Sequence, residues 1–448
     1  MEIYGYDRGT PDSDLPRNND YEALSSTDPK RIEQRVDSPA LLTPPISDSW
    51  YYARPVPVCF PSDLTPLPAL VLENKMNMVY FHYFINYTSK ILVTHDCASN
   101  PFRTVLPKLA MKDENLLSLV LAYASCHRAR LLHHAEPINR IASYVTHLFP
   151  RFREALASGQ PVSETLFGTC VMLASLTQSY PWAFDAPISW PQHLGMARQM
   201  CQSVVSRKNR PRSKAMYFFL RWFGYLDTFA SCSANHYRGS FEVWSPDLLE
   251  VENNASMGCL VGYTNRSLVL LARTADLAKA CDQERKTTGN LSPKTVMESQ
   301  LLRCTLELTT LEIPHQRYEC TSVSVNASSE IFRAVNTSLC HAALIMLHRR
   351  VYALPSESPL VQSSVHGIMA SLSQPDICQY LDIPDVILPL YLAGSESQNP
   401  GLRNETSRRL QRIGDAGMSQ VARVRNLLHH IWESGQDWTA AEHEVLLG

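Results

Sequence analysis

Apolar side chains recur at intervals of three and four residues through most of the chain after about Leu72. This interval matches the α-helical turn and places the apolar side chains on one face of each segment. Few segments alternate apolar and polar residues strictly enough to predict strands. The pattern predicts helices over 73–94, 114–134, 138–157, 163–179, 192–206, 214–232, 266–282, 294–311, 329–353, 362–373, 402–413 and 416–434. We therefore expect an all-α fold, with one large multi-helix domain over residues 72–448.

Two of these helices have a chemically defined start. Asp113 can accept a hydrogen bond from a first-turn amide, and Glu114 suits the positive end of the helix dipole. Ser292 stands directly before Pro293, whose missing N–H and fixed φ suit the first helical position. We expect helices to begin at these two points.

Residues 1–71 have a different composition and no helical periodicity. Eleven of the 29 prolines fall in residues 1–70, where eleven acidic residues outnumber six basic ones. Such a segment cannot bury enough apolar surface to fold, so we expect a disordered, proline-rich, acidic tail. Ser38 and Thr43 each precede a proline there and are candidate sites for a proline-directed kinase. The alternative interpretation is an unmodified tail.

The segment 114–134 contains one cysteine and three histidines, which raises the question of a metal site. Cys126 and His133 share a helix face, and His127 and His134 share another, but each pair is seven residues apart. This separation is about 10.5 Å along a helix axis, too far for two ligands of one zinc ion. We expect a core helix with a basic C-terminal end, and no metal.

Composition and charge exclude several classes of protein. The formal net charge of −2 gives no field that would attract nucleic acid or an anionic membrane. The twelve cysteines are scattered, and the N-terminus does not resemble a secretory signal. The longest uncharged run, Thr165 to Phe184, is interrupted by polar residues and a proline, so we expect no membrane span.

A basic segment, "RKNRPRSK", lies between two predicted helices at residues 207–214. Nuclear import receptors bind clustered basic side chains in extended segments, so this is a candidate nuclear import signal. Its basic residues are Arg207, Lys208, Arg210, Arg212 and Lys214. The alternative is a solvated interhelical loop.

The segment 217–244 is rich in aromatic residues around an isolated acid. One interpretation is the wall of a ligand pocket, formed by Trp222, Tyr225, Asp227 and His236. The other is a central core helix whose acid reaches water, a backbone amide or a partner cation, because an unpaired buried carboxylate is costly.

The common catalytic motifs are absent from the sequence. It contains no phosphate-binding loop, no dinucleotide-binding glycine motif, no nucleophile elbow and no zinc-protease motif. We therefore predict no catalytic residues, no cofactor and no metal. A divergent all-α enzyme is the weakest of the alternatives that remain.

Three stretches occur in the order typical of one family. They are "NPFRTVLPKLAMKDENLLSLVLAYASCHRARLL" at 100–132, "ISWPQHLGMARQM" at 188–200 and "LPLYLAGSES" at 388–397. With the closing segment that contains Trp432 and Trp438, they resemble the fungal-specific transcription factor domain, the helical region downstream of a binuclear zinc cluster. The resemblance covers about 72–448 and implies an all-α regulatory domain and a nuclear role.

The sequence departs from that family at its N-terminal end. Family members usually carry six cysteines near the N-terminus, beginning C-x2-C-x6-C, whereas here Cys59 alone precedes residue 97. One cysteine cannot supply six thiolates. We therefore expect no direct DNA binding through such a module. Small relatives without the cluster resemble pathway-specific regulators of secondary-metabolite gene clusters, of which the trichothecene cluster is one example.

The leading hypothesis is a non-catalytic nuclear regulator that gives positive control of a secondary-metabolite cluster. It would act through a DNA-binding transcription factor or the transcription machinery, with DNA contacted only indirectly, and as a homo- or heterodimer. The second hypothesis is a helical small-molecule sensor whose pocket is lined by the aromatic segment.

Overall fold

The structure, a computed structural model, describes residues 60–135, 137–146, 148–158, 162–181, 190–205, 213–233, 263–311 and 325–439. Within these ranges 79% of the residues are helical and none lies in a strand, which confirms the all-α prediction. Across the same ranges, no helix has the length and hydropathy of a membrane span. Ser38 and Thr43 lie outside the described residues.

The chain divides into two units, with the boundary between His82 and Tyr83. The first unit contains η4 (Ser62–Leu64), α2 (Ala69–Leu72) and most of α3 (Lys75–Tyr83). The side-chain amide of Asn77 donates to the carbonyl of Leu70 at 2.8 Å, and the ring of Phe60 stacks on that of Phe81. Helical structure thus begins at Ser62, inside the segment 1–71 that the sequence pattern assigns to the tail.

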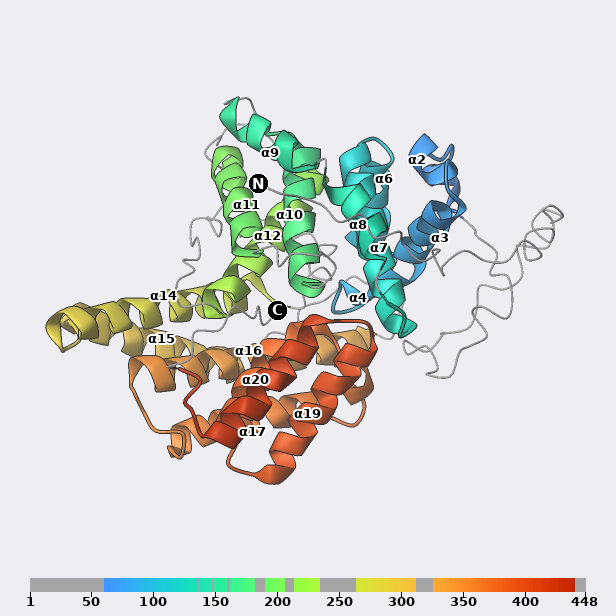
Figure 1. The fold of residues 1–448 in the computed structure, drawn as a ribbon. Coiled ribbons are helices and arrows are strands. Elements are labelled where there is room, and N and C mark those ends of the chain that lie inside the picture. Colours follow the sequence, from blue (N-terminus) through green and yellow to red (C-terminus); the bar gives the residue numbers. More distant parts are fainter. Residues whose placement is uncertain are drawn as a thin grey trace, which may run out of the picture. The chain divides into compact units, whose positions relative to one another are not determined.

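The first half of the second unit is built around α7 (Glu114–Leu131), which is buried continuously from Leu116 to Ala129. It packs against α8 and α10, and α10 in turn packs against α11 and α12 (Figure 1). The helices of this half are η5 (Phe84–Thr88), α4 (Ser89–Ile91), α5 (Pro101–Thr104), α6 (Leu106–Ala110), α7, α8 (Ile138–Val145), α9 (Leu148–Ala157), α10 (Glu164–Ser179), α11 (Trp190–Val205) and α12 (Lys214–Ser233). The α7 helix starts as expected, since Asp113 accepts from the amides of Asn115 and Leu116.

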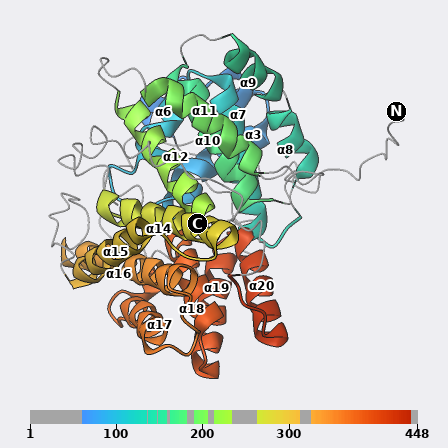
Figure 2. The same ribbon diagram turned by 90° about the vertical axis from the view of Figure 1, so that its left-hand side faces the viewer.

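The second half is centred on α16, which packs against α14, α15, α17 and α18 (Figures 1 and 2). Its helices are α14 (Asn265–Thr288), α15 (Pro293–Leu311), α16 (Val325–Met346), η9 (Leu347–Val351), α17 (Pro359–Leu372), η10 (Cys378–Tyr380), η11 (Pro384–Val386), α18 (Ile387–Glu396), α19 (Pro400–Asp415) and α20 (Gln420–Ser434). The predicted helix 329–353 is therefore two elements, an α-helix that continues into the π-helix η9.

The connection between α14 and α15 reverses the chain direction in four residues. Gly289 has φ +77°, a left-handed conformation that glycine adopts without steric cost, and it ends α14. The Ser292 hydroxyl accepts from the amide of Thr295 at 3.3 Å, and α15 begins at Pro293 as the sequence predicts. The two helices lie side by side in both ribbon views (Figures 1 and 2).

Candidate functional site

Two of the predicted pocket residues on α12 line a small cavity. Trp222 and Tyr225 are buried there, 4% and 7% exposed, and face residues from α7, α10 and the start of α20. The cavity volume is about 40 Å³. Since one water molecule needs at least about 10–15 Å³, the space can admit water-sized groups.

The other two predicted pocket residues do not join this group. Asp227 is absent from the cavity lining, and its carboxylate pairs with Arg198 of α11 at 2.5 Å, with 3% of the side chain exposed. A partner cation, one of the three expected ways to satisfy this buried acid, is therefore present. His236 lies outside the described residues.

The cavity has polar walls that sequence patterns did not indicate. The hydroxyl of Tyr123 lies 3.2 Å from that of Ser175 and 3.0 Å from that of Ser179, and burial raises the pKa of Tyr123 to about 12. Gln420, at the first position of α20, is 2% exposed. Neither its amide oxygen nor its amide nitrogen has a hydrogen-bond partner among the described residues. A buried amide of this kind normally has a protein or water partner.

A second set of polar contacts adjoins the cavity at Asp385, which is 8% exposed. The hydroxyl of Thr94 donates to its carboxylate, and the hydroxyl of Tyr263 donates to its backbone carbonyl. Burial, with the nearby charge of Asp385, raises the pKa of both Tyr225 and Tyr263 well above the ordinary value. These tyrosines therefore stay protonated and act as hydrogen-bond donors.

His127 connects α7 to the loop after α19. Its Nδ1 lies 3.0 Å from the hydroxyl of Thr88, and its Nε2 lies 3.1 Å from the carbonyl oxygen of Ala416. Burial lowers the pKa of His127 to about 4, so the ring is neutral near pH 7. Because Nε2 faces a carbonyl, it donates, and Nδ1 accepts from Thr88. The residue serves as a buried structural link between two segments.

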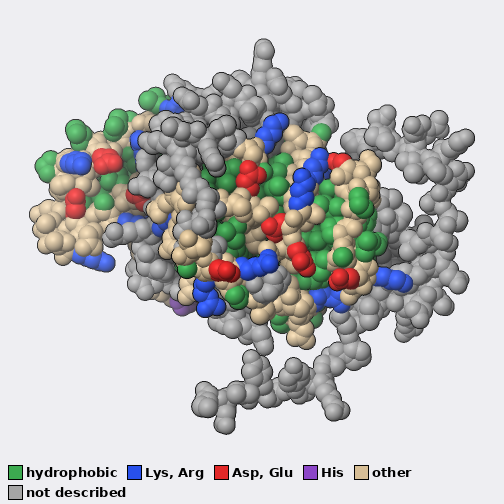
Figure 3. Space-filling model, turned by 90° about the horizontal axis from the view of Figure 1, so that it is seen from above, with side chains coloured by type: hydrophobic (Ala, Val, Ile, Leu, Met, Phe, Trp, Pro, Cys, Tyr) green, Lys and Arg blue, Asp and Glu red, His purple; other side chains and the backbone are tan. Residues whose placement is uncertain are grey.

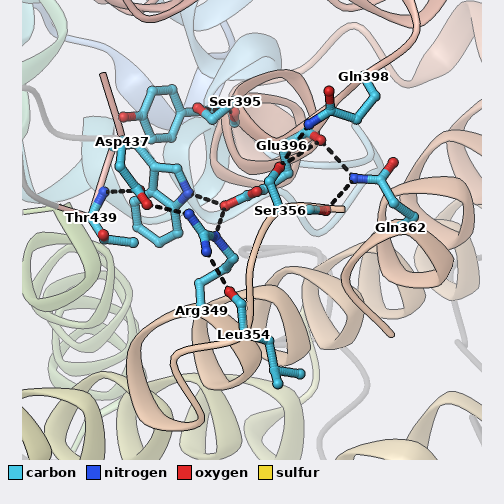
Figure 4. Close-up of polar contacts among 11 residues, drawn as sticks. Arg349, Leu354, Ser356, Gln362, Ser395, Glu396, Gln398, Asp437 and Thr439 are labelled. Atoms are coloured by element: carbon cyan, nitrogen blue, oxygen red, sulfur yellow. Dashed lines mark hydrogen bonds and ion pairs between the residues drawn. The ribbon is translucent and has the colours of Figure 1, made fainter. Parts of the chain in front are cut away.

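A network of charges fixes the chain that follows α20 (Figure 4). Arg349 of η9 donates to Glu396 at 2.5 Å, to the carbonyl of Leu354 and to Asp437. The indole of Trp438 donates to the same Glu396 carboxylate, which is 1% exposed. Burial alone would lower the pKa of Arg349, but Glu396 and Asp437 outweigh it and raise that pKa. We call Arg349, Glu396, Asp437 and Trp438 the C-terminal clamp.

Further hydrogen bonds support the C-terminal clamp from α17 and α18 (Figure 4). The side-chain amide of Gln362 donates to the carbonyl of Glu396 at 2.8 Å and to that of Ser356 at 2.7 Å. Trp432 of α20 donates to the carbonyl of Gly394 at 2.9 Å. The two tryptophans noted in the sequence therefore bind the same end of α18.

Most of the predicted import signal lies outside the described residues, namely Arg207, Lys208, Arg210 and Arg212. Lys214, its last member, is exposed at the first position of α12. Within the ranges that the structure describes, no group of three His, Cys, Asp or Glu side chains is placed to hold a metal ion.

Within the described residues, the domain is all-helical and buried polar contacts join helices that are far apart in sequence. Comparison with protein families gives its class: the model of the fungal specific transcription factor domain matches residues 79–442. The chain belongs to that family, and this makes it a transcriptional regulator. No curated protein and no solved structure matches the chain.

Proposed function

We propose that the protein is a pathway-specific nuclear regulator that activates a fungal secondary-metabolite gene cluster and has no catalytic role. The observation that carries this proposal is the family match over residues 79–442. The basic segment 207–214 supports nuclear import, and the acidic, proline-rich segment 1–71 supports contacts with the transcription machinery.

We further propose that the protein reaches DNA through a DNA-binding partner. Cys59 alone precedes residue 97, and Cys97 is itself buried in the helical domain. Residues 1–96 therefore hold too few thiolates for two zinc ions. A net charge of −2 gives no compensating attraction to phosphates.

Gene deletion followed by transcript profiling tests the regulatory role. Transcripts of one contiguous biosynthetic cluster should fall in the deletion strain and recover on complementation with the intact gene. Other clusters serve as internal controls and should be unchanged. Unaltered expression of every cluster would remove the proposal, and increased expression would show a repressor instead.

A binding assay with purified full-length protein tests the partner mechanism. Promoter fragments of the affected cluster should not be retained by the purified chain at physiological salt, whereas addition of nuclear extract should restore retention. Sequence-selective binding by the purified chain alone would contradict the requirement for a partner.

Sensing of a small polar molecule is a second candidate function, favoured by the unpartnered amide of Gln420 at the cavity. A volume of about 40 Å³ fits water-sized or slightly larger polar groups, not a drug-sized ligand. A panel of short amides, polyols and hydroxy acids should include one that raises the melting temperature. Gln420→Leu should lose that response, whereas the control Gln411→Leu, at an exposed position of α19, should keep it. Identical melting temperatures with every compound would eliminate the sensor.

A further inference from the structure

The helix α15 has one buried face and, on the opposite side, an exposed apolar face. Its buried face contains Thr295, Ser299, Leu302, Leu306 and Thr309, and it packs against α14 and α16. The opposite face exposes Met297 and Leu301, both 68%, Leu308, 51%, and Leu311, 83%. Cys304, also exposed, lies between them. We call these last five residues the α15 stripe.

The α15 stripe has the spacing of a helix-pairing seam. Its members follow one another at intervals of four, three, four and three residues, so they lie along one line of the helix, as in the a and d positions of coiled coils. In Figure 3 several hydrophobic side chains are visible, among charged and other side chains, at the left-hand end, where α14 and α15 lie in Figure 1. Large apolar side chains left exposed along one helix face typically mark an interaction site.

We propose that the α15 stripe is the homodimer interface of this protein, formed by antiparallel pairing with α15 of a second copy. The order of apolar positions about Cys304 supports a two-fold arrangement. Met297 and Leu311 are each seven residues from Cys304, and Leu301 and Leu308 are three and four residues from it. An isologous interface needs such self-complementarity, since the same surface serves both partners.

The available area agrees with a modest dimer. Four large side chains exposed to this degree leave on the order of 500 Å² of apolar surface on each copy, comparable with the largest patch on a typical monomer. Pairing two copies removes on the order of 1,000 Å² from water, the lower limit for a specific interface. The net charge of −2 gives little repulsion between copies.

Sedimentation of the full-length protein over a range of concentrations tests this proposal. The wild type should dimerise reversibly, and Leu301→Asp/Leu308→Asp should raise the dimer dissociation constant about tenfold or more, because each carboxylate would be buried unpaired. The matched control is Leu360→Asp on α17, where a leucine is 45% exposed outside the α15 stripe, and it should leave the dimer intact. Circular dichroism should show unchanged helicity in all three proteins.

Cross-linking through Cys304 gives a second readout that does not depend on destabilising variants. In antiparallel pairing centred on the α15 stripe, the two Cys304 thiols lie near the two-fold axis. A short bis-maleimide should therefore link two wild-type chains, and Cys304→Ser should abolish the product. A wild type that stays monomeric at all concentrations would overturn the proposal, as would a dimer that persists in Leu301→Asp/Leu308→Asp. Cys304 that resists maleimide labelling in a monomer would show that a segment of the same chain covers the stripe.

Discussion

At the residue scale, Gly417 shows how closely the loop after α19 approaches α7. Its φ is +99°, and a Cβ built there would lie 2.5 Å from the ring of His127. We predict that Gly417→Ala lowers the free energy of unfolding by about 3 kcal/mol, from the left-handed conformation and the clash together. The control is Gly289→Ala, where φ is +77° but nothing lies within 4 Å, and the expected loss is about 1 kcal/mol. Equal losses in urea titrations would show that the ring of His127 moves aside freely.

His127 also predicts a dependence of stability on pH. Its pKa is about 4 in the folded protein and near the ordinary histidine value of 6.5 when unfolded, so the unfolded chain binds more protons between these values. The stabilisation is complete above pH 6.5 and is lost as pH falls towards 4. Burial also lowers the pKa values of His193 and His348 to about 4. Between pH 4 and 6.5, the free energy of unfolding should therefore change less steeply with pH for His127→Gln than for the wild type. An unchanged pH dependence would contradict the assignment.

At the scale of elements, the C-terminal clamp joins η9, α18 and the segment after α20. Arg349→Met leaves the Glu396 carboxylate buried beside Trp438 without its cation, so we predict a loss of about 3 kcal/mol in unfolding free energy. Arg349→Met/Glu396→Gln should recover part of that loss, because the remaining amide needs no counter-ion. Arg408→Met provides the control, since Arg408 is 63% exposed and its pair with Glu405 is worth little. Chemical denaturation of the wild type and the three variants measures these differences, and equal stability of Arg349→Met and Arg408→Met would refute the role of the clamp.

The elements also show which parts of the fold the sequence pattern could predict. Amphipathic helices such as 402–413 and 416–434 have one apolar face, and the structure has α19 and α20 there. Helix α18 was not predicted, because "ILPLYLAGSE" is buried nearly all round and contains Pro389 near its start, so it has no helical alternation. Helices α5 and α6 were missed for a related reason, since each is short and begins at or near a proline. The cavity lining beyond Trp222 and Tyr225 was not predictable, because Tyr123, Asp385 and Gln420 meet only through tertiary packing.

At the scale of the whole helical unit, Asp385 connects segments that are far apart in sequence. It accepts from Thr94, and the Tyr263 hydroxyl binds its backbone, so the regions before α5 and after α12 share one anchor. His127 and Ser179 make comparable links, to Ala416 and Ser419. With polar links at several points, neither half of the unit can unfold without leaving buried groups of the other unpaired. We therefore expect residues 83–439 to unfold as one cooperative system.

Hydrogen exchange of an Asp385→Ala variant tests that cooperativity. The change leaves the hydroxyl of Thr94 without its acceptor and should cost about 2 kcal/mol. If the unit is cooperative, exchange should accelerate by a similar factor in peptides from α7 and from α16, although neither helix contains the substituted residue. Ser143→Ala, which removes an exposed hydroxyl bond within α8, should leave both rates unchanged. Faster exchange confined to residues 263–439 would instead mean that the two halves unfold separately, and that the buried links contribute less than the packing within each half.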